Sequence, residues 1–138
     1  MAANPPLYLL DTNILVFISK LAPPVLKKIT EIDRRHIAVP ALVAAEMAYG
    51  VEKSLHKERN RISLEFLLSG YKILPWTHLA MWHYARQYQR LREAGRLIGH
   101  IDLLIAAQAL SLDAVLVTNN TREFNLVEGL RVEDWTAT

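Results

Sequence analysis

Short apolar runs alternate along the chain with longer stretches in which apolar residues recur every three or four positions. Five runs have the length of strands: residues 7–10, 37–39, 72–75, 114–117 and 130–132. The stretches between them are typical of helices; Val25, Ile29 and Ile32, for example, share one helix face. Strands that alternate with helices favour a parallel sheet covered on both faces. We therefore predict an α/β fold with three layers, α/β/α, and a mainly parallel sheet.

Three details of this pattern concern the connecting segments. Residues 56–61 are rich in charge, and we predict a turn there, ahead of a helix that contains Ile62 and Phe66. Residues 118–120 are predicted to be a polar loop after the fourth strand. Thr77 is predicted to cap a long helix with a shared face. The residues on that face are Met81, Ala85, Tyr88 and Leu91.

Asp11 directly follows the first apolar run and precedes Thr12 and Asn13. A short apolar run suits a strand buried on both faces of a parallel sheet. Open α/β sheets bind their ligands at the carboxyl ends of such strands, so a carboxylate there is a candidate for chemistry. Asp, Thr and Asn are also helix-capping residues. From this stretch alone, a purely capping role for Asp11 is an open alternative.

Two further acids have apolar surroundings. Glu46 lies within the helix predicted at residues 41–52, and we expect it to be desolvated, which is costly for a lone charge. Asp102 falls in the first turn of the helix predicted at residues 101–112. Each has a structural alternative. Glu46 could pair with an arginine, and Asp102 could favour the positive end of its helix.

Carboxylates gathered in one cleft repel one another unless a cation joins them. The chain has no cysteine, and oxygen ligands suit Mg²⁺ or Mn²⁺ rather than Zn²⁺. Asn120 is a fourth candidate, because its amide oxygen can contact a metal or its water without adding charge. The alternative for Asn120, Thr118 and Asn119 is a turn or a helix cap.

Composition limits the remaining classes. With 138 residues, 51% of them hydrophobic, a single domain over residues 1–138 is expected. No stretch approaches the roughly 20 apolar residues of a membrane span, and no signal peptide is recognised. We therefore expect a cytoplasmic protein with no membrane contact. The formal net charge of +2 permits a nucleic-acid partner.

Four basic or aromatic polar residues are candidates for contact with substrate phosphates. Arg86 and Arg90 are four positions apart and share a helix face. Arg96 and His100 are close in sequence to Asp102. The pattern is consistent with a phosphate-binding rim for RNA and also with an ordinary solvated helix surface.

In order and spacing, these motifs resemble the PIN-domain ribonucleases, and within that group the VapC toxins of bacterial toxin–antitoxin pairs. The resemblance covers almost the whole chain. The matching motifs are residues 9–13, Glu46 with Tyr49 and Gly50, residues 98–107, residues 117–124 and residues 129–135.

The resemblance implies that Asp11, Glu46 and Asp102 bind a catalytic Mg²⁺, for which Mn²⁺ can substitute. The residues that would support these acids are Thr12, Asn13, Thr118 and Asn119. Two positions depart from the family pattern. Many relatives have an aspartate in place of Asn120 and a serine in place of Ala45.

The activity that the resemblance implies is Mg²⁺-dependent endoribonuclease cleavage, by hydrolysis of phosphodiester bonds in structured RNA. The substrate class is tRNA, and the segment at residues 118–124 resembles relatives that act on initiator tRNA. The resemblance also implies a homodimer. A small VapB-like antitoxin would block the site and supply binding to operator DNA.

Two other function classes are compatible with parts of the sequence. A phosphoaspartyl protein would also place an aspartate at a strand end, but a haloacid-type phosphatase would need a second aspartate where Asn13 stands. A non-catalytic module that binds RNA or a partner could keep the same fold. Asn120 is the feature that favours the module.

Overall fold

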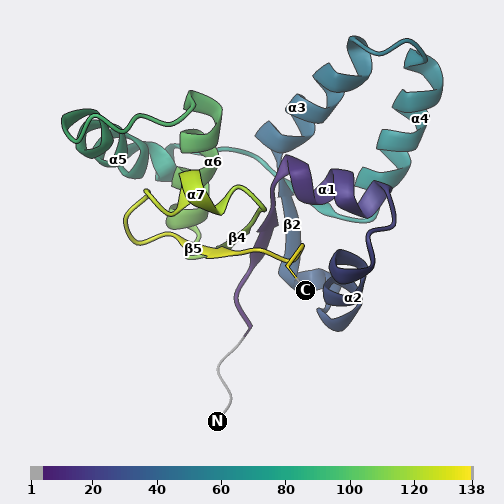
Figure 1. Ribbon diagram of the computed structural model, residues 1–138, viewed down its shortest axis with the longest axis horizontal. Coiled ribbons are helices and arrows are strands. Elements are labelled where there is room, and N and C mark those ends of the chain that lie inside the picture. Colours follow the sequence, from purple (N-terminus) through teal and green to yellow (C-terminus); the bar gives the residue numbers. More distant parts are fainter. Residues whose placement is uncertain (1–4, 138) are drawn as a thin grey trace.

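The computed structural model describes residues 5–137, which contain a five-stranded sheet (Figure 1). The strands are β1 (Tyr8–Leu10), β2 (Ile37–Pro40), β3 (Lys72–Leu74), β4 (Val115–Val117) and β5 (Arg131–Glu133). Their order is β3-β2-β1-β4-β5, and every neighbouring pair is parallel. The five predicted strands are confirmed, each within two residues of the expected ends.

Helices flank the sheet on both sides, as predicted. They are α1 (Thr12–Ser19), α2 (Pro23–Glu31), α3 (Ala41–Glu52), α4 (Lys57–Leu68), α5 (Met81–Glu93), α6 (His100–Ser111) and α7 (Thr121–Phe124). Two short 3₁₀ turns are η1 (Arg34–His36) and η2 (His78–Ala80). In the view of Figure 1, α1 to α4 lie to one side of β1 and β2, and α5 to α7 lie to the other. None of the helices in residues 5–137 has the length and apolar character needed to cross a membrane.

Burial along the strands follows the sequence pattern. Every residue of β2 and β4 is buried, and Leu9 and Leu10 of the central β1 have no exposed surface. The edge strands carry charge, with Lys72 on β3 and Arg131 on β5, and both residues are exposed. Central strands of a parallel sheet are covered on both faces and therefore need continuous apolar sequence.

The predicted turn at residues 56–61 is wrong, because α4 begins at Lys57. The apolar residues of α4 begin only at Ile62, and its first turn carries Lys57, Glu58 and Arg59, so no apolar position marks where the helix starts. Charge stabilises it locally: Arg61 Nε lies 3.0 Å from Glu65 Oε1, one turn further on. The charged residues from Lys57 to Arg61 therefore belong to the first turns of an exposed helix.

The helix predicted from Thr77 begins later than expected. The Thr77 hydroxyl oxygen accepts a hydrogen bond from the Leu79 N–H at 3.4 Å and caps η2, and α5 starts at Met81. The shared buried face is present only near the end of α5. Leu91 is buried there, but Met81 at the start is 46% exposed.

The carboxyl ends of β1, β2 and β4 meet at one edge of the sheet, because the strands are parallel. Asp11 follows β1, and its N–H donates to the Val117 carbonyl oxygen at the end of β4 at 2.9 Å. Helix α3 begins directly after β2 at Ala41. The sheet topology thus gathers several of the predicted site residues at the edge where open α/β sheets bind ligands.

Candidate active site

The Asp11 carboxylate is 4% exposed and lies among three hydrogen-bond donors. The Thr12 N–H donates to Oδ1 at 2.9 Å, so Asp11 does cap α1. The Thr118 hydroxyl and the Asn13 amide donate to Oδ2 at 2.8 Å and 3.2 Å. Burial raises the pKa of Asp11, the hydrogen bonds partly oppose that rise, and the negative charge of Glu123 adds to it. Capping and a place in the site are therefore not alternatives.

Thr118 and Asn13 tie the loop after β4 to the start of α1. The fully buried Thr118 hydroxyl oxygen accepts hydrogen bonds from the Asn13 amide at 3.2 Å and from the Asn120 N–H at 3.0 Å. Asn13 Oδ1 accepts from the Asn119 N–H at 2.9 Å. Asn119 thus takes part through its backbone, and its side chain is exposed. These bonds fix the orientation of the Asp11 carboxylate.

Glu46 is exposed, so the expected desolvation of this residue is wrong. Of the residues of α3 only Val43 is buried, because one face of the helix meets the core and Glu46 lies on another. The Thr12 hydroxyl donates to Glu46 Oε1 at 3.2 Å. Thr12 therefore contacts two carboxylates: its N–H bonds Asp11 and its hydroxyl bonds Glu46.

Asp102 is half-buried in the first turn of α6. Its pKa is raised to about 7 by burial first, and then by the negative charges of Glu123, Asp11 and Glu46. A hydrogen bond with Glu123 contributes in the same direction. The predicted acids, which come from three different helices or helix starts, therefore lie near enough for their charges to act on Asp102.

Glu123 is the site residue that sequence reasoning missed. It is half-buried on α7, where its Oε1 accepts a hydrogen bond from the Gly99 N–H at 3.1 Å. It follows Asn120 by three positions, a spacing that puts both on one side of a helical turn. Residues 118–120 do form the predicted loop, but the helix that follows them was not expected. Recognising that helix would have brought Glu123 to notice.

The Asn120 side chain is hydrogen-bonded to the Glu123 carboxylate. Its amide nitrogen donates to Glu123 Oε2 at 2.6 Å, and its own N–H donates to Thr118. The amide was predicted to offer an oxygen to a metal. The observed contact instead holds a carboxylate in place, so the Glu123 carboxylate lies beside the Asn120 side chain.

Within residues 5–137, no ion pair joins a basic side chain to these acids. The ion pairs found within residues 5–137 involve other carboxylates, and none includes Asp11, Glu46, Asp102 or Glu123. Over the same range, no three acidic or histidine side chains stand close enough to form a finished metal site. The candidate site is therefore a group of four acids that no ion pair within residues 5–137 compensates.

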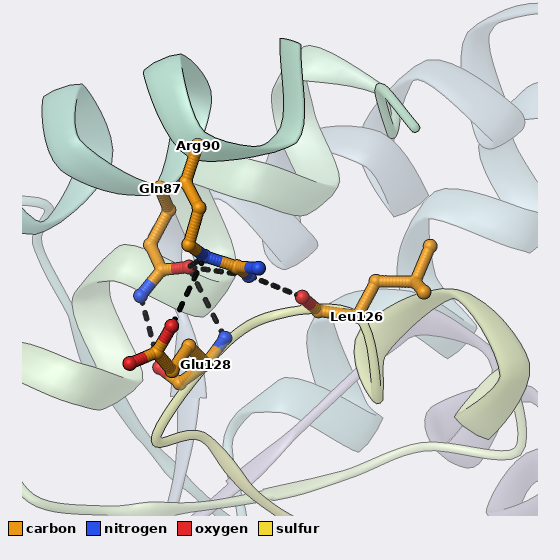
Figure 2. A network of polar contacts seen from close by, with 4 residues as sticks. All are labelled: Gln87, Arg90, Leu126 and Glu128. Carbon is orange, nitrogen blue, oxygen red and sulfur yellow. Dashed lines mark hydrogen bonds and ion pairs between the residues drawn. The ribbon is translucent and has the colours of Figure 1, made fainter. Parts of the chain in front are cut away.

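The candidate substrate contacts differ from one another. Arg86 and Arg96 are exposed, and no ion pair in the described residues includes either. The exposed His100 ring stacks on Tyr88, with centroids 5.4 Å apart, beside Asp102 in the sequence. Arg90 is different, because its guanidinium bonds to Gln87 and to the Leu126 carbonyl oxygen (Figure 2). The Arg90 guanidinium is thus occupied by hydrogen bonds within the protein.

Comparison with known proteins places this arrangement in a family. Residues 8–130 match the PIN domain. "Ribonuclease VapC2" of Rickettsia felis is 37% identical over 131 residues, which are 94% of this chain and 98% of the relative. The "tRNA(fMet)-specific endonuclease VapC" of Shigella flexneri is 36% identical over 128 residues, 93% of this chain and 97% of the relative.

Solved structures agree with the sequence relatives. The DNA-bound VapBC of Salmonella typhimurium contains a chain that matches with a TM-score of 0.87 and 33% identity, covering 95% of this chain and 99% of that one. VapBC2 of Rickettsia felis, bound to a promoter DNA fragment, matches with a TM-score of 0.85 and 36% identity, over 94% and 98% of the two chains. The chain therefore belongs to the PIN-domain family and, within it, to the VapC ribonucleases. The predicted resemblance is confirmed.

Proposed function

We propose that this chain is a cytoplasmic endoribonuclease that depends on a divalent metal, with Mg²⁺ as the usual ion and Mn²⁺ as a substitute. The observation that carries the proposal is the convergence of four acids without a basic partner. Four carboxylates so close together repel one another. The repulsion is relieved only if a cation binds among them or if some of them remain protonated. The raised pKa of Asp102, to about 7, reflects burial together with this repulsion.

The donor set fits Mg²⁺ in its chemistry. All four candidate ligands are carboxylates, and Mg²⁺ prefers oxygen. The acids do not form a finished cage, and Mg²⁺ does not need one, since it commonly keeps several waters and takes only one or two carboxylates directly. We assign Asp11, Glu46 and Asp102 to the metal, with Glu123 as the fourth acid in place of Asn120.

A bound Mg²⁺ supplies Lewis acidity and an activated water for in-line attack on phosphorus. The chain's own residues prepare the site for this. Thr118 and Asn13 hold the Asp11 carboxylate in one orientation, which removes the need to reorganise it during the reaction. Thr12 sets Glu46 relative to Asp11. Burial and the neighbouring acids raise the pKa of Asp102 to about 7, and a bound cation would lower it by favouring the charged form.

The proposed substrate is structured RNA, in particular tRNA and among tRNAs the initiator. This is supported by the named activity of the Shigella flexneri relative and by the resemblance of residues 118–124 to enzymes of that specificity. The exposed Arg86, Arg96 and His100 are proposed to contact the RNA. Arginine binds phosphate through its charge, and an exposed aromatic ring can stack on an unpaired base.

The proposed partner is a VapB-like antitoxin, supported by the VapBC complexes among the solved structures. A cavity of about 820 Å³, with a mainly apolar lining, is bounded by residues of α1, α3 and α4. Ile62 and Phe66 on its rim are 67% and 81% exposed. Such a groove suits the apolar face of a partner helix. Contact with operator DNA is proposed to come only through the antitoxin.

A homodimer is the proposed assembly of the toxin. Three large apolar side chains of η2 and the start of α5 are exposed: Leu79 by 65%, Met81 by 46% and Trp82 by 62%. Apolar patches of this kind mark interaction surfaces. We propose that a second copy of the chain covers them.

The alternative function, a non-catalytic module that binds RNA or a partner, is no longer favoured by the feature that supported it. That argument was the missing fourth aspartate at Asn120, and Glu123 stands beside Asn120 in the structure. Cleavage is therefore the function that we put forward.

The test is incubation of purified, antitoxin-free protein with total bacterial RNA, in Mg²⁺ and in EDTA. We expect discrete fragments in Mg²⁺ alone, and mapping of their new ends identifies the substrate. If folded protein binds RNA but leaves it intact under every condition, the proposal fails and the binding module takes its place.

A further inference from the structure

Two side chains of α5 hold the backbone that follows α7 (Figure 2). Gln87 Nε2 donates to the Glu128 carbonyl oxygen at 2.9 Å, and Gln87 Oε1 accepts from the Glu128 N–H at 3.1 Å. Arg90 donates to the Leu126 carbonyl oxygen and, at 3.0 Å, to Gln87 Oε1. Arg90 Nε also lies 3.4 Å from Glu128 Oε2. We call this group, Gln87, Arg90, Leu126 and Glu128, the α5 clasp.

The clasp matters because α7 cannot hold its own position. The helix has four residues, and helices of that length are unstable without contacts outside themselves. Phe124 is its one buried residue, and Val127 is buried shortly after it. These two apolar anchors lie within or after the last turn of α7, so polar contacts on either side of the helix are needed to define where it lies.

The other side of α7 contributes to the candidate active site. Glu123 accepts hydrogen bonds from the Asn120 amide and from the Gly99 N–H. Gly99 precedes α6, and Asp102 lies in the first turn of that helix. The short helix is therefore held from both sides, by the α5 clasp after its end and by Gly99 at the site.

We propose that Gln87 and Arg90 are positioning residues, which set the place of Glu123 in the active site by holding the backbone at Leu126 and Glu128. The Arg90 side chain is then occupied by its contacts with Gln87, Leu126 and Glu128, and it does not bind RNA phosphate. The effect on RNA cleavage rests on the proposed function. The effect on the hydrogen bond between Glu123 and Gly99 does not.

The direct readout is the Gly99 backbone amide, followed by ¹H–¹⁵N NMR. Gly99 is exposed and precedes the first turn of α6, so protection of its N–H depends on the bond to Glu123. The chain has five glycines, which keeps this spectral region easy to assign. The variants are Gln87→Ala and Arg90→Lys. The control is Gln89→Ala, on the same helix, because Gln89 is exposed and bonds only to Glu93 within α5.

We expect the Gly99 amide proton to move upfield and to exchange faster in Gln87→Ala and Arg90→Lys, with no change in Gln89→Ala. Arg90→Lys keeps the charge and loses the planar fork that bonds two oxygens at once. The remaining cross-peaks report that each variant is folded. An unmoved Gly99 signal in folded Gln87→Ala overturns the inference and leaves the proposed ribonuclease function standing.

Cleavage kinetics give the second readout. A displaced Glu123 lowers kcat by about tenfold without changing KM, since small misplacements of site groups cost rate rather than binding. Gln87 carries no charge, so its loss cannot act through a phosphate contact. If Gln87→Ala or Arg90→Lys raises KM and leaves both kcat and the Gly99 signal unchanged, these residues contact substrate and the inference is wrong. If wild-type protein cleaves no RNA, only the proposed function fails, because the NMR result is independent.

Discussion

The Thr118 hydroxyl donates a 2.8 Å hydrogen bond to the buried Asp11 carboxylate, across 107 positions of the chain. The same hydroxyl oxygen accepts bonds from Asn13 and Asn120. One small side chain therefore connects the ends of β1 and β4 with the loop that leads to α7. It orients an acid of the site and cannot leave its place without freeing several polar groups.

Removal of this hydroxyl is expected to reduce both stability and activity. In Thr118→Val the Asp11 carboxylate loses a donor and two further donors lose their acceptor, at a cost of about 1–3 kcal/mol. We expect RNA cleavage to fall by about tenfold or more, because Asp11 is no longer held in orientation. Urea unfolding and cleavage rates measure the two effects. Thr118→Ser, which keeps the hydroxyl, should retain most of both; equal losses in the Ser and Val variants would show that the hydroxyl is not the decisive group.

Asp102 makes the metal-free protein less stable as the pH rises. Its folded pKa of about 7 lies above its ordinary value of 3.8. Between these values the folded protein holds a proton that the unfolded chain has released, so the free energy of unfolding falls as pH rises from about 4 to 7 and then levels. Thermal melts in EDTA from pH 4 to 8 measure this fall.

The matching variant is Asp102→Asn, which cannot ionise. At pH 8 in EDTA we expect it to be more stable than wild type by on the order of 1 kcal/mol, a rise in Tm of roughly 3–5 °C, with solvent screening limiting the effect. Its stability should also vary less with pH. A variant that melts below wild type at pH 8 would show that the Asp102 charge is compensated by a group that we have not identified.

A divalent cation is expected to offset the loss of stability that ionisation of Asp102 causes. Millimolar Mg²⁺ or Mn²⁺ should raise the Tm of wild-type protein at pH 8, because an ion that binds the folded state alone stabilises it by mass action. The rise should be small or absent in Asp11→Asn and Asp102→Asn. Ca²⁺ and high NaCl serve as controls for general ionic strength. The same rise in wild type and in both variants would place the bound ion elsewhere.

Glu123→Gln tests the acid that sequence reasoning missed. The substitution preserves size and a hydrogen-bond acceptor for Gly99 but removes one of four negative charges. We expect cleavage to fall by about a hundredfold if the lost charge helped to bind the metal, together with a lower pKa for Asp102. The exposed Glu93→Gln on α5 is the matched control, expected to cleave normally. Full activity in Glu123→Gln would remove this residue from the site.

The exposed arginines are predicted to act on RNA binding and to leave the chemistry unchanged. Arg86→Ala and Arg96→Ala should each weaken binding to all RNAs alike and reduce the salt dependence of log Kd by about 1. Arg90→Lys should leave the salt slope unchanged, because that guanidinium is occupied by Gln87 and Leu126. Filter binding across a salt series separates the three. A slope that changes only in the Arg90 variant would reverse the assignment.

The strands could be predicted because their signal is local. A short apolar run between turn residues, such as residues 115–117, favours a buried strand, and its place in a parallel sheet follows from the alternation with helices. Asp11 and Asp102 could be singled out for the same reason, since each acid adjoins apolar sequence. The exposure of Glu46 was not predictable, because it depends on which face of α3 meets the core.

The contacts of Glu123 and Arg90 lie beyond local pattern. Glu123 bonds Gly99 across 24 positions, and Arg90 bonds Leu126 across 36. The sequence within one helical turn of Glu123 or of Arg90 therefore does not indicate Gly99 or Leu126 as the bonded partner. The four-residue α7 is likewise stabilised by contacts made far along the chain, so its sequence carries only a weak helix signal.

The most direct measurement is the single-turnover rate of RNA cleavage at increasing Mg²⁺, for wild-type protein and for Asp102→Asn. We predict a wild-type rate that rises with Mg²⁺ to a plateau and disappears in EDTA, and a variant that stays at background while remaining folded. Cleavage that persists in EDTA, or an Asp102→Asn rate equal to that of wild type, would contradict a metal-dependent ribonuclease site built on these acids.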